Sequence, residues 1–145
     1  MRAMKQIVVA VDGSEGARIA LETAVELASG YGATLAAVYA RHRSPSFVGS
    51  PYAQQTLSEE LRKAHAALAQ ATAVAERAGA TIETEDLEGD PADVILEFAR
   101  NRSAGLIVVG SRGLGTVAGA LLGSVSSKVV HHADRPVLVA RRPPA

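Results

Sequence analysis

The sequence predicts an α/β fold in which a parallel β-sheet is covered by helices on both faces. Short apolar segments rich in valine and isoleucine alternate with longer segments whose apolar residues recur at helical spacing. The segments 6–11 and 106–109 are apolar without alternation, which is typical of strands buried on both faces. Strands that alternate with helices form right-handed βαβ units and hence a parallel sheet.

Composition indicates a single domain spanning residues 1–145. The chain is 48% apolar, so it can bury a core, and no internal repeat is evident. It carries 15 basic and 15 acidic residues and few aromatic ones, which disfavours nucleic acid as a partner. Its apolar runs are too short to span a bilayer, and no secretory leader pattern begins the chain. Together with the absence of cysteine, these features predict a cytoplasmic protein that does not engage a membrane.

The first predicted strand, residues 6–11, leads into a predicted helix. Ser14 can cap the start of this helix, because a serine hydroxyl can accept a hydrogen bond from a first-turn N–H group. Either Gly30 or Gly32 can end it, since glycine adopts the left-handed conformation common there. A second strand is predicted over residues 34–39.

A long polar loop is predicted over residues 41–55, followed by a long helix that ends near Gly79. Apolar residues at helical spacing predict one buried stripe on this helix. The stripe comprises Leu57, Leu61, Ala64, Leu68, Ala71, Ala75 and Ala78.

The second half of the chain predicts further strands and helices. Charged residues place the strand 81–87 at an edge of the sheet. Asp90 followed by Pro91 marks a helix start, with aspartate as the N-cap and proline in the first turn. A fifth strand is predicted over residues 136–140, with proline at its first position.

The glycine-rich segment 110–123 is the strongest functional signal. It follows the strand 106–109 and precedes a helix that we expect to begin at Ser124, with this residue as a plausible N-cap. Glycine lets a ligand approach the backbone closely, and a helix N-terminus offers free N–H groups and a positive dipole end. Phosphate is therefore the expected occupant. The only cation of this loop, Arg112, could pair with phosphate or remain solvated.

Two better-known phosphate motifs do not match this segment. The spacing from Gly110 to Gly115 resembles a P-loop, but the required lysine is missing. The pattern from Gly113 to Ala118 formally matches a dinucleotide fingerprint. That fingerprint requires a tight turn and an acidic residue at the end of the next strand, and neither is present, which disfavours NAD.

Asp12 ends the first strand and could take part in the same site. If the first and fourth strands are neighbours, Asp12 lies across a crevice from the glycine-rich segment. There its carboxylate could accept ribose hydroxyls or hold Mg²⁺ between phosphates. The pair Asp12-Gly13 could equally serve only to form a turn.

The spacing of Gly110, Gly113, Gly123 and Ser124 forms the pattern Gly-x2-Gly-x9-Gly-Ser. With this pattern, and with further motifs at 9–15, 88–95 and 132–139, the chain resembles the universal stress protein family, specifically its ATP-binding branch. The resemblance covers nearly the whole chain. It implies a Rossmann-like domain with a five-stranded parallel sheet in the order 3-2-1-4-5. It also implies a homodimer in which the strand Pro136-Ala140 pairs with its copy.

The same resemblance implies which residues would bind ATP. Ala10, Val11 and Asp12 would line the adenosine side, and Ala40 would meet the adenine edge through its backbone. Asp12 is the possible magnesium ligand, acting through Mg-ATP. The residues expected around the phosphates are Val109, Gly110, Arg112, Gly113, Gly123, Ser124, Val125 and Ser126.

The leading hypothesis is an ATP-binding regulatory protein of a stress response. A slow ATPase or nucleotide-cleaving enzyme is an alternative in which Asp12 could hold Mg²⁺, but no second carboxylate or histidine is visibly placed to orient water, and no catalytic residue is expected. A protein-interaction module that does not bind nucleotide is a further alternative. The sequence does not distinguish ATP from AMP or cyclic AMP.

Overall fold

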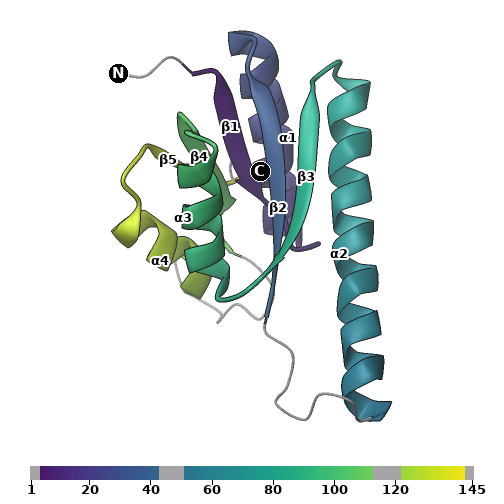
Figure 1. The fold of residues 1–145 in the computed structure, drawn as a ribbon. Helices are drawn as coiled ribbons and strands as arrows, with labels where there is room; N and C mark the ends of the chain where they lie inside the picture. The colour runs from purple at the N-terminus through teal and green to yellow at the C-terminus, as the bar shows by residue number, and fades with distance from the viewer. Residues whose placement is uncertain (1–3, 43–50, 113–121, 143–145) are drawn as a thin grey trace.

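The computed structural model describes residues 4–42, 51–112 and 122–142 (Figure 1). Five strands alternate with four helices in this part of the chain. In chain order they are β1 (Gln6–Ala10), α1 (Glu15–Tyr31), β2 (Thr34–Arg41), α2 (Pro51–Arg77), β3 (Ile82–Glu88), α3 (Pro91–Asn101), β4 (Leu106–Gly110), α4 (Ser124–His132) and β5 (Val137–Ala140).

The strands form one parallel sheet in the order β3-β2-β1-β4-β5, which confirms the predicted α/β fold and strand order. The central strand β1 pairs with β2 on one side and with β4 on the other. The chain order of the strands therefore reverses between β1 and β4, and in open α/β sheets ligands bind at the carboxyl ends of the strands at such a point.

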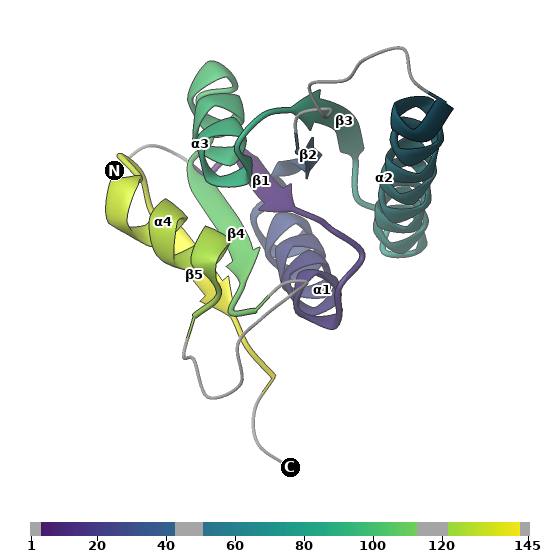
Figure 2. The same cartoon turned by 90° about the horizontal axis from the view of Figure 1, so that it is seen from below.

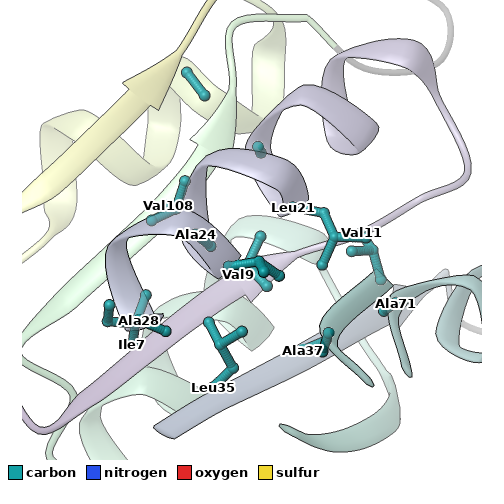
Figure 3. Packing of buried hydrophobic residues seen from close by; sticks show 14 of the residues in the cluster. Ile7, Val9, Val11, Leu21, Ala24, Ala28, Leu35, Ala37, Ala71 and Val108 are labelled. Carbon is teal, nitrogen blue, oxygen red and sulfur yellow. The ribbon is translucent and has the colours of Figure 1, made fainter. Parts of the chain in front are cut away.

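Helices cover both faces of the sheet, with α1 and α2 on one side and α3 and α4 on the other (Figure 2). Alternate residues of each central strand point to opposite faces. Val9 and Leu35 therefore pack with α1 and α2, as Figure 3 shows from close by, whereas Val8 and Val38 pack with α3 and α4. The sheet thus has two buried apolar faces, as its unbroken apolar strands predicted.

Alanine dominates the contact between α2 and the sheet. Its buried residues are Ala53, Ala64, Ala67, Ala71 and Ala75. The predicted stripe is wrong at Leu57 and Leu61, which are 36% and 43% exposed, and at Ala78, which is also exposed. The first turns of α2 project beyond the ends of the strands in Figure 1.

The predicted loop 41–55 is too long at both ends. Strand β2 continues to Arg41, which pairs in register with Glu88 and whose Nε lies 2.6 Å from Asp86 Oδ1. Helix α2 already begins at Pro51, which suits a first helical turn because proline has no N–H group to satisfy there.

Three of the expected helix ends are confirmed. The Ser14 hydroxyl accepts a hydrogen bond from Ala17 N, and Asp90 caps α3 through Asp93 N. Gly32, and not Gly30, ends α1 in the left-handed conformation, at φ 64°. These caps fix where α1 and α3 start, immediately beyond the carboxyl ends of the strands that precede them.

Two expectations at the end of the chain need correction. Gly123, not Ser124, is the N-cap of α4, and Ser124 is the first helical residue. Strand β5 begins at Val137, although the Pro136 carbonyl already accepts a hydrogen bond from Ile107 N. The predicted edge position of β3 is confirmed, since β3 and β5 form the two edges of the sheet.

Candidate functional site

A cavity of about 390 Å³ lies at the carboxyl ends of the strands, where their order reverses. Its volume falls within the range of ligand pockets, about 300–1,000 Å³. Strands β1, β2 and β4 supply its floor, and α1, α2, α3 and α4 supply its walls. The reversal of strand order thus creates a place where a sheet of this kind is expected to hold a ligand.

Helix α4 begins at the wall of this cavity. Its N-cap, Gly123, makes no side-chain capping bond, so no side chain competes for the N–H groups of the first turn. The Gly123 N–H itself donates to the Ser111 carbonyl at 2.7 Å, which holds the helix start against the end of β4. An anion in the cavity would therefore meet uncapped N–H groups and the positive end of the helix dipole.

The Ser126 side chain contributes to the shape of this wall. It is buried, and its hydroxyl donates to the Gly110 carbonyl at 2.7 Å. This hydrogen bond joins α4 to the last residue of β4. The hydroxyl oxygen can still accept a hydrogen bond, but its proton is used within the protein.

Asp12 forms the turn between β1 and α1. Its Oδ1 accepts a hydrogen bond from Ser14 N at 2.9 Å, and Gly13 adopts a positive φ of 83°. The turn-forming role that the sequence allowed is therefore present. Asp12 also lines the cavity, so the turn does not remove it from the site.

The start of α1 and the end of β4 approach each other through glycine. A Cβ atom placed on Gly16 would lie 1.9 Å from the Arg112 carbonyl oxygen, and one on Gly110 would lie 2.5 Å from the Gly16 carbonyl oxygen. A side chain at either glycine would therefore force the backbone of α1 or of the segment after β4 to move. Gly16, which the sequence analysis did not single out, is thus as necessary to this corner of the site as Gly110.

The structure brings the sequence-predicted site residues together around one cavity. Those that line it are Ala10, Val11, Asp12, Ala40, Val109, Gly110, Arg112, Gly123, Ser124, Val125 and Ser126. Gly113 lies outside the described residues. Arg112 is exposed as well as lining the cavity, so it can turn toward an anion without breaking a packed contact.

Sequence reasoning missed two walls of the cavity. Pro91 and Ile95, on the first turns of α3, form an apolar wall. Glu60 and Lys63 of α2, whose charged groups lie 3.5 Å apart, form a polar wall together with Tyr39. Their positions depend on where the helices dock, and no local sequence pattern marks them.

An ion pair connects the two helices on the α3–α4 side. Lys128 Nζ lies 2.9 Å from Asp90 Oδ2 and 3.4 Å from Asp93 Oδ1. The hydrogen bond from Lys128, reinforced by the Asp93 N–H group, lowers the pKa of Asp90. The same bond raises the pKa of Lys128. Lys128 therefore links α4 to the start of α3, and both helices border the cavity.

Metal-binding clusters are absent from the described part of the chain. No group of three or more histidine or acidic side chains converges there. Any divalent cation at this site would therefore need oxygen ligands from the bound molecule in addition to Asp12.

The family model described as "Universal stress protein family" matches residues 4–141. The chain belongs to the universal stress protein family. A universal stress protein of Thermus aquaticus is 39% identical over 140 residues, which cover 94% of this chain and 98% of the relative. The resemblance inferred from the glycine pattern is thus confirmed at the level of the family.

Two solved structures of relatives carry adenine nucleotides. One universal stress protein, in complex with cAMP, is 33% identical with a TM-score of 0.69, and the match covers 97% of this chain and 98% of that one. Another, from Archaeoglobus fulgidus in complex with dAMP, is 26% identical with a TM-score of 0.72, over 97% of this chain and 100% of that one. Adenine nucleotides are therefore ligands of structural neighbours of this universal stress protein.

No helix within the described ranges combines the length and the apolar character needed to cross a bilayer. Although α2 has 27 residues, charged residues recur along it.

Proposed function

We propose that this universal stress protein binds ATP in the cavity at the carboxyl ends of β1, β2 and β4, and that binding regulates a stress response. The observation that carries the proposal is the uncapped start of α4 at the cavity wall. Adenine-nucleotide binding by structural neighbours supports the same assignment.

The lining of the cavity offers both kinds of contact that a nucleotide needs. Ala10, Ala40 and Ile95 are small or apolar residues that suit a base. Arg112 and the first turn of α4 suit phosphate.

Mg²⁺ would accompany the phosphates. Asp12, which follows β1, brings a carboxylate to the cavity. In nucleotide sites, Mg²⁺ is commonly held by one or two carboxylates together with phosphate oxygens and water. The donor set thus suits a cation that arrives with the nucleotide rather than one bound in advance.

Thermal unfolding tests this function directly. A ligand that binds only the native state raises the midpoint by mass action, by about 2.7 kcal/mol of stability when its concentration is about 100 times Kd. Mg-ATP at millimolar concentration should raise the midpoint, whereas Mg-GTP, NAD and FMN should raise it less. An unchanged midpoint with Mg-ATP would contradict the proposal.

We also propose a homodimer that forms through β5. This strand is an edge of the sheet, and its apolar residues Val137, Leu138 and Val139 are only half-buried. Ile107 N and Ser111 N donate to the carbonyls of Pro136 and Ala140. Since backbone groups point alternately to opposite sides of a strand, those of Val137 and Val139 face the free edge, where a second copy can pair.

A further inference from the structure

Tyr39 is a buried tyrosine at the wall of the cavity. It lies on β2 directly before Ala40, is only 5% exposed, and packs in the core cluster between the sheet and the helices α1 and α2. It also lines the cavity. A residue of the core cluster therefore also borders the space assigned to the nucleotide.

The Tyr39 hydroxyl has no hydrogen-bond partner in residues 4–42, 51–112 and 122–142. Yet this part of the structure contains no fully buried side-chain nitrogen or oxygen atom that lacks a partner. Because the phenol oxygen has no partner, it cannot be fully buried and must be accessible to solvent. The cavity that Tyr39 lines accounts for this access. A hydroxyl held in this way gains a hydrogen bond when a ligand supplies an acceptor.

The charges around this hydroxyl select the kind of group it can meet. Burial, followed by the carboxylates of Glu60 and Asp12, raises the pKa of the Tyr39 phenol. The phenol therefore keeps its proton at neutral pH and can donate it. The carboxylates of Glu60 and Asp12 favour, beside this phenol, a ligand group that can also donate a hydrogen bond.

A neutral hydroxyl satisfies both demands at once. It can accept a hydrogen bond from the Tyr39 phenol and donate one to a carboxylate such as Asp12. In a nucleotide, the ribose carries such hydroxyls between the base and the phosphates. Tyr39 and Asp12 both line the cavity, and the Asp12 carboxylate is close enough to act on the phenol. Asp12 lies on the proposed adenosine side, so the ribose is the part of the ligand within reach.

We propose that Tyr39 is a ligand-contacting residue that donates a hydrogen bond to a ribose hydroxyl of the bound nucleotide. This inference rests on the proposed ATP-binding function. It assigns to the α2 side of the cavity a role in recognising the sugar, distinct from phosphate binding at α4.

Calorimetric titration of three nucleotides into two variants tests the inference. The nucleotides are ATP, 2′-deoxy-ATP and 3′-deoxy-ATP, each with Mg²⁺. The variant Tyr39→Phe removes only the hydroxyl. The matched control is Tyr31→Phe, which makes the same change on a side chain that is 64% exposed at the end of α1.

The wild type should prefer ATP over the deoxynucleotide that lacks the contacted hydroxyl by roughly 3- to 10-fold, the usual net effect of one hydrogen bond. Tyr39→Phe should weaken ATP binding by the same factor and bind that deoxynucleotide as the wild type does. Tyr31→Phe should change neither affinity. This loss of preference, confined to one variant and one nucleotide, would support the inference.

Equal weakening of all three nucleotides by Tyr39→Phe, or no weakening, would overturn the inference while leaving the proposed ATP binding intact. Absence of ATP binding by the wild type would instead overturn the proposed function, and this inference with it. If Tyr39→Phe does not fold, the inference can be tested by NMR on wild-type protein whose tyrosines carry a 13C label at Cζ. The Tyr39 Cζ resonance should then shift more with ATP than with one of the deoxynucleotides, and equal shifts would contradict the inference.

Discussion

Lys128 Nζ lies 2.9 Å from Asp90 Oδ2, so a lysine of α4 is bonded to the residue that caps α3. Both helices start at the cavity, since α3 contributes Pro91 and α4 contributes Ser124 to its walls. The ion pair therefore connects the two walls. Because both of its side chains are exposed, it adds little stability by itself.

The charge of Asp90 makes part of the stability depend on pH. The pKa of Asp90 is lowered in the folded protein by Lys128 and by the Asp93 N–H group, so ionised Asp90 favours the folded state. This stability is fully present above the pKa of an unfolded aspartate, about 3.9. It is lost as the pH falls from there through the lower pKa of the folded state.

Asp90→Asn isolates that charge, because asparagine caps a helix about as well as aspartate. At pH 7 the variant should unfold at a slightly lower temperature than the wild type, and the difference should shrink toward zero when both are compared near pH 2. Melting curves by circular dichroism at the two pH values measure this. A difference that stays constant with pH would show that the carboxylate charge is not the cause.

Gly16→Ala should disturb the corner where α1 meets β4. The added Cβ would lie 1.9 Å from the Arg112 carbonyl oxygen, so the backbone must move. We expect the free energy of unfolding to fall by about 1–3 kcal/mol, as it does for overpacked cores. We also expect weaker ATP binding, because Arg112 is displaced. Denaturant unfolding and calorimetry provide the two measurements.

Gly30→Ala is the matched control in the same helix. Nothing lies within 4 Å of a Cβ atom at Gly30, and its φ is not positive. Alanine should therefore stabilise α1 by about 0.5–1 kcal/mol and leave ATP binding unchanged. If both glycine variants lost the same stability, the close approach would not be the reason for the loss at Gly16.

Most of the fold could be predicted from the sequence because each element is marked locally. Buried strands such as 106–109 are continuously apolar, and Ser14 and Asp90 are strong helix caps. The exposure of Leu57 and Leu61 could not be predicted, because helical periodicity shows which face of a helix turns inward but not how completely each turn of that face is covered. The strand order came from the family resemblance and not from the composition of any strand.

The site was predictable where one segment carries it and unpredictable where several helices meet. The glycine pattern correctly located the cavity at the end of β4. Between Gly123 and Ser124, local preference alone favoured serine as the cap, yet glycine occupies that position. Gly16, Glu60 and Tyr39 were missed because their contacts join segments far apart in the sequence.

Gly123→Asp should separate helix stability from ATP binding. Gly123 has an extended backbone, φ −71° and ψ 169°, which any residue can adopt, and a carboxylate there can cap the first turn of α4. We therefore expect the unfolding midpoint without ligand to stay the same or rise slightly. The midpoint shift caused by Mg-ATP should disappear, because the carboxylate occupies the N–H groups and repels phosphate.

Gly123→Asn supplies the control for charge. Asparagine can cap the helix in the same way without a negative charge, so it should retain more of the Mg-ATP shift than aspartate does. Equal shifts for the wild type, the asparagine variant and the aspartate variant would place the phosphates away from α4.

Val139→Pro should prevent dimer formation while leaving the sheet intact. The Val139 N–H faces the free edge of β5, so proline removes a group that a second copy would need but not one that pairs with β4. Val139→Thr keeps the N–H and serves as the control. Sedimentation should then show a monomer for the proline variant and a dimer for the wild type and the threonine variant. A proline variant that stays dimeric with an unchanged melting temperature would mean that the copies associate through another surface, because antiparallel pairing at β5 should be weakened by the loss of this hydrogen bond.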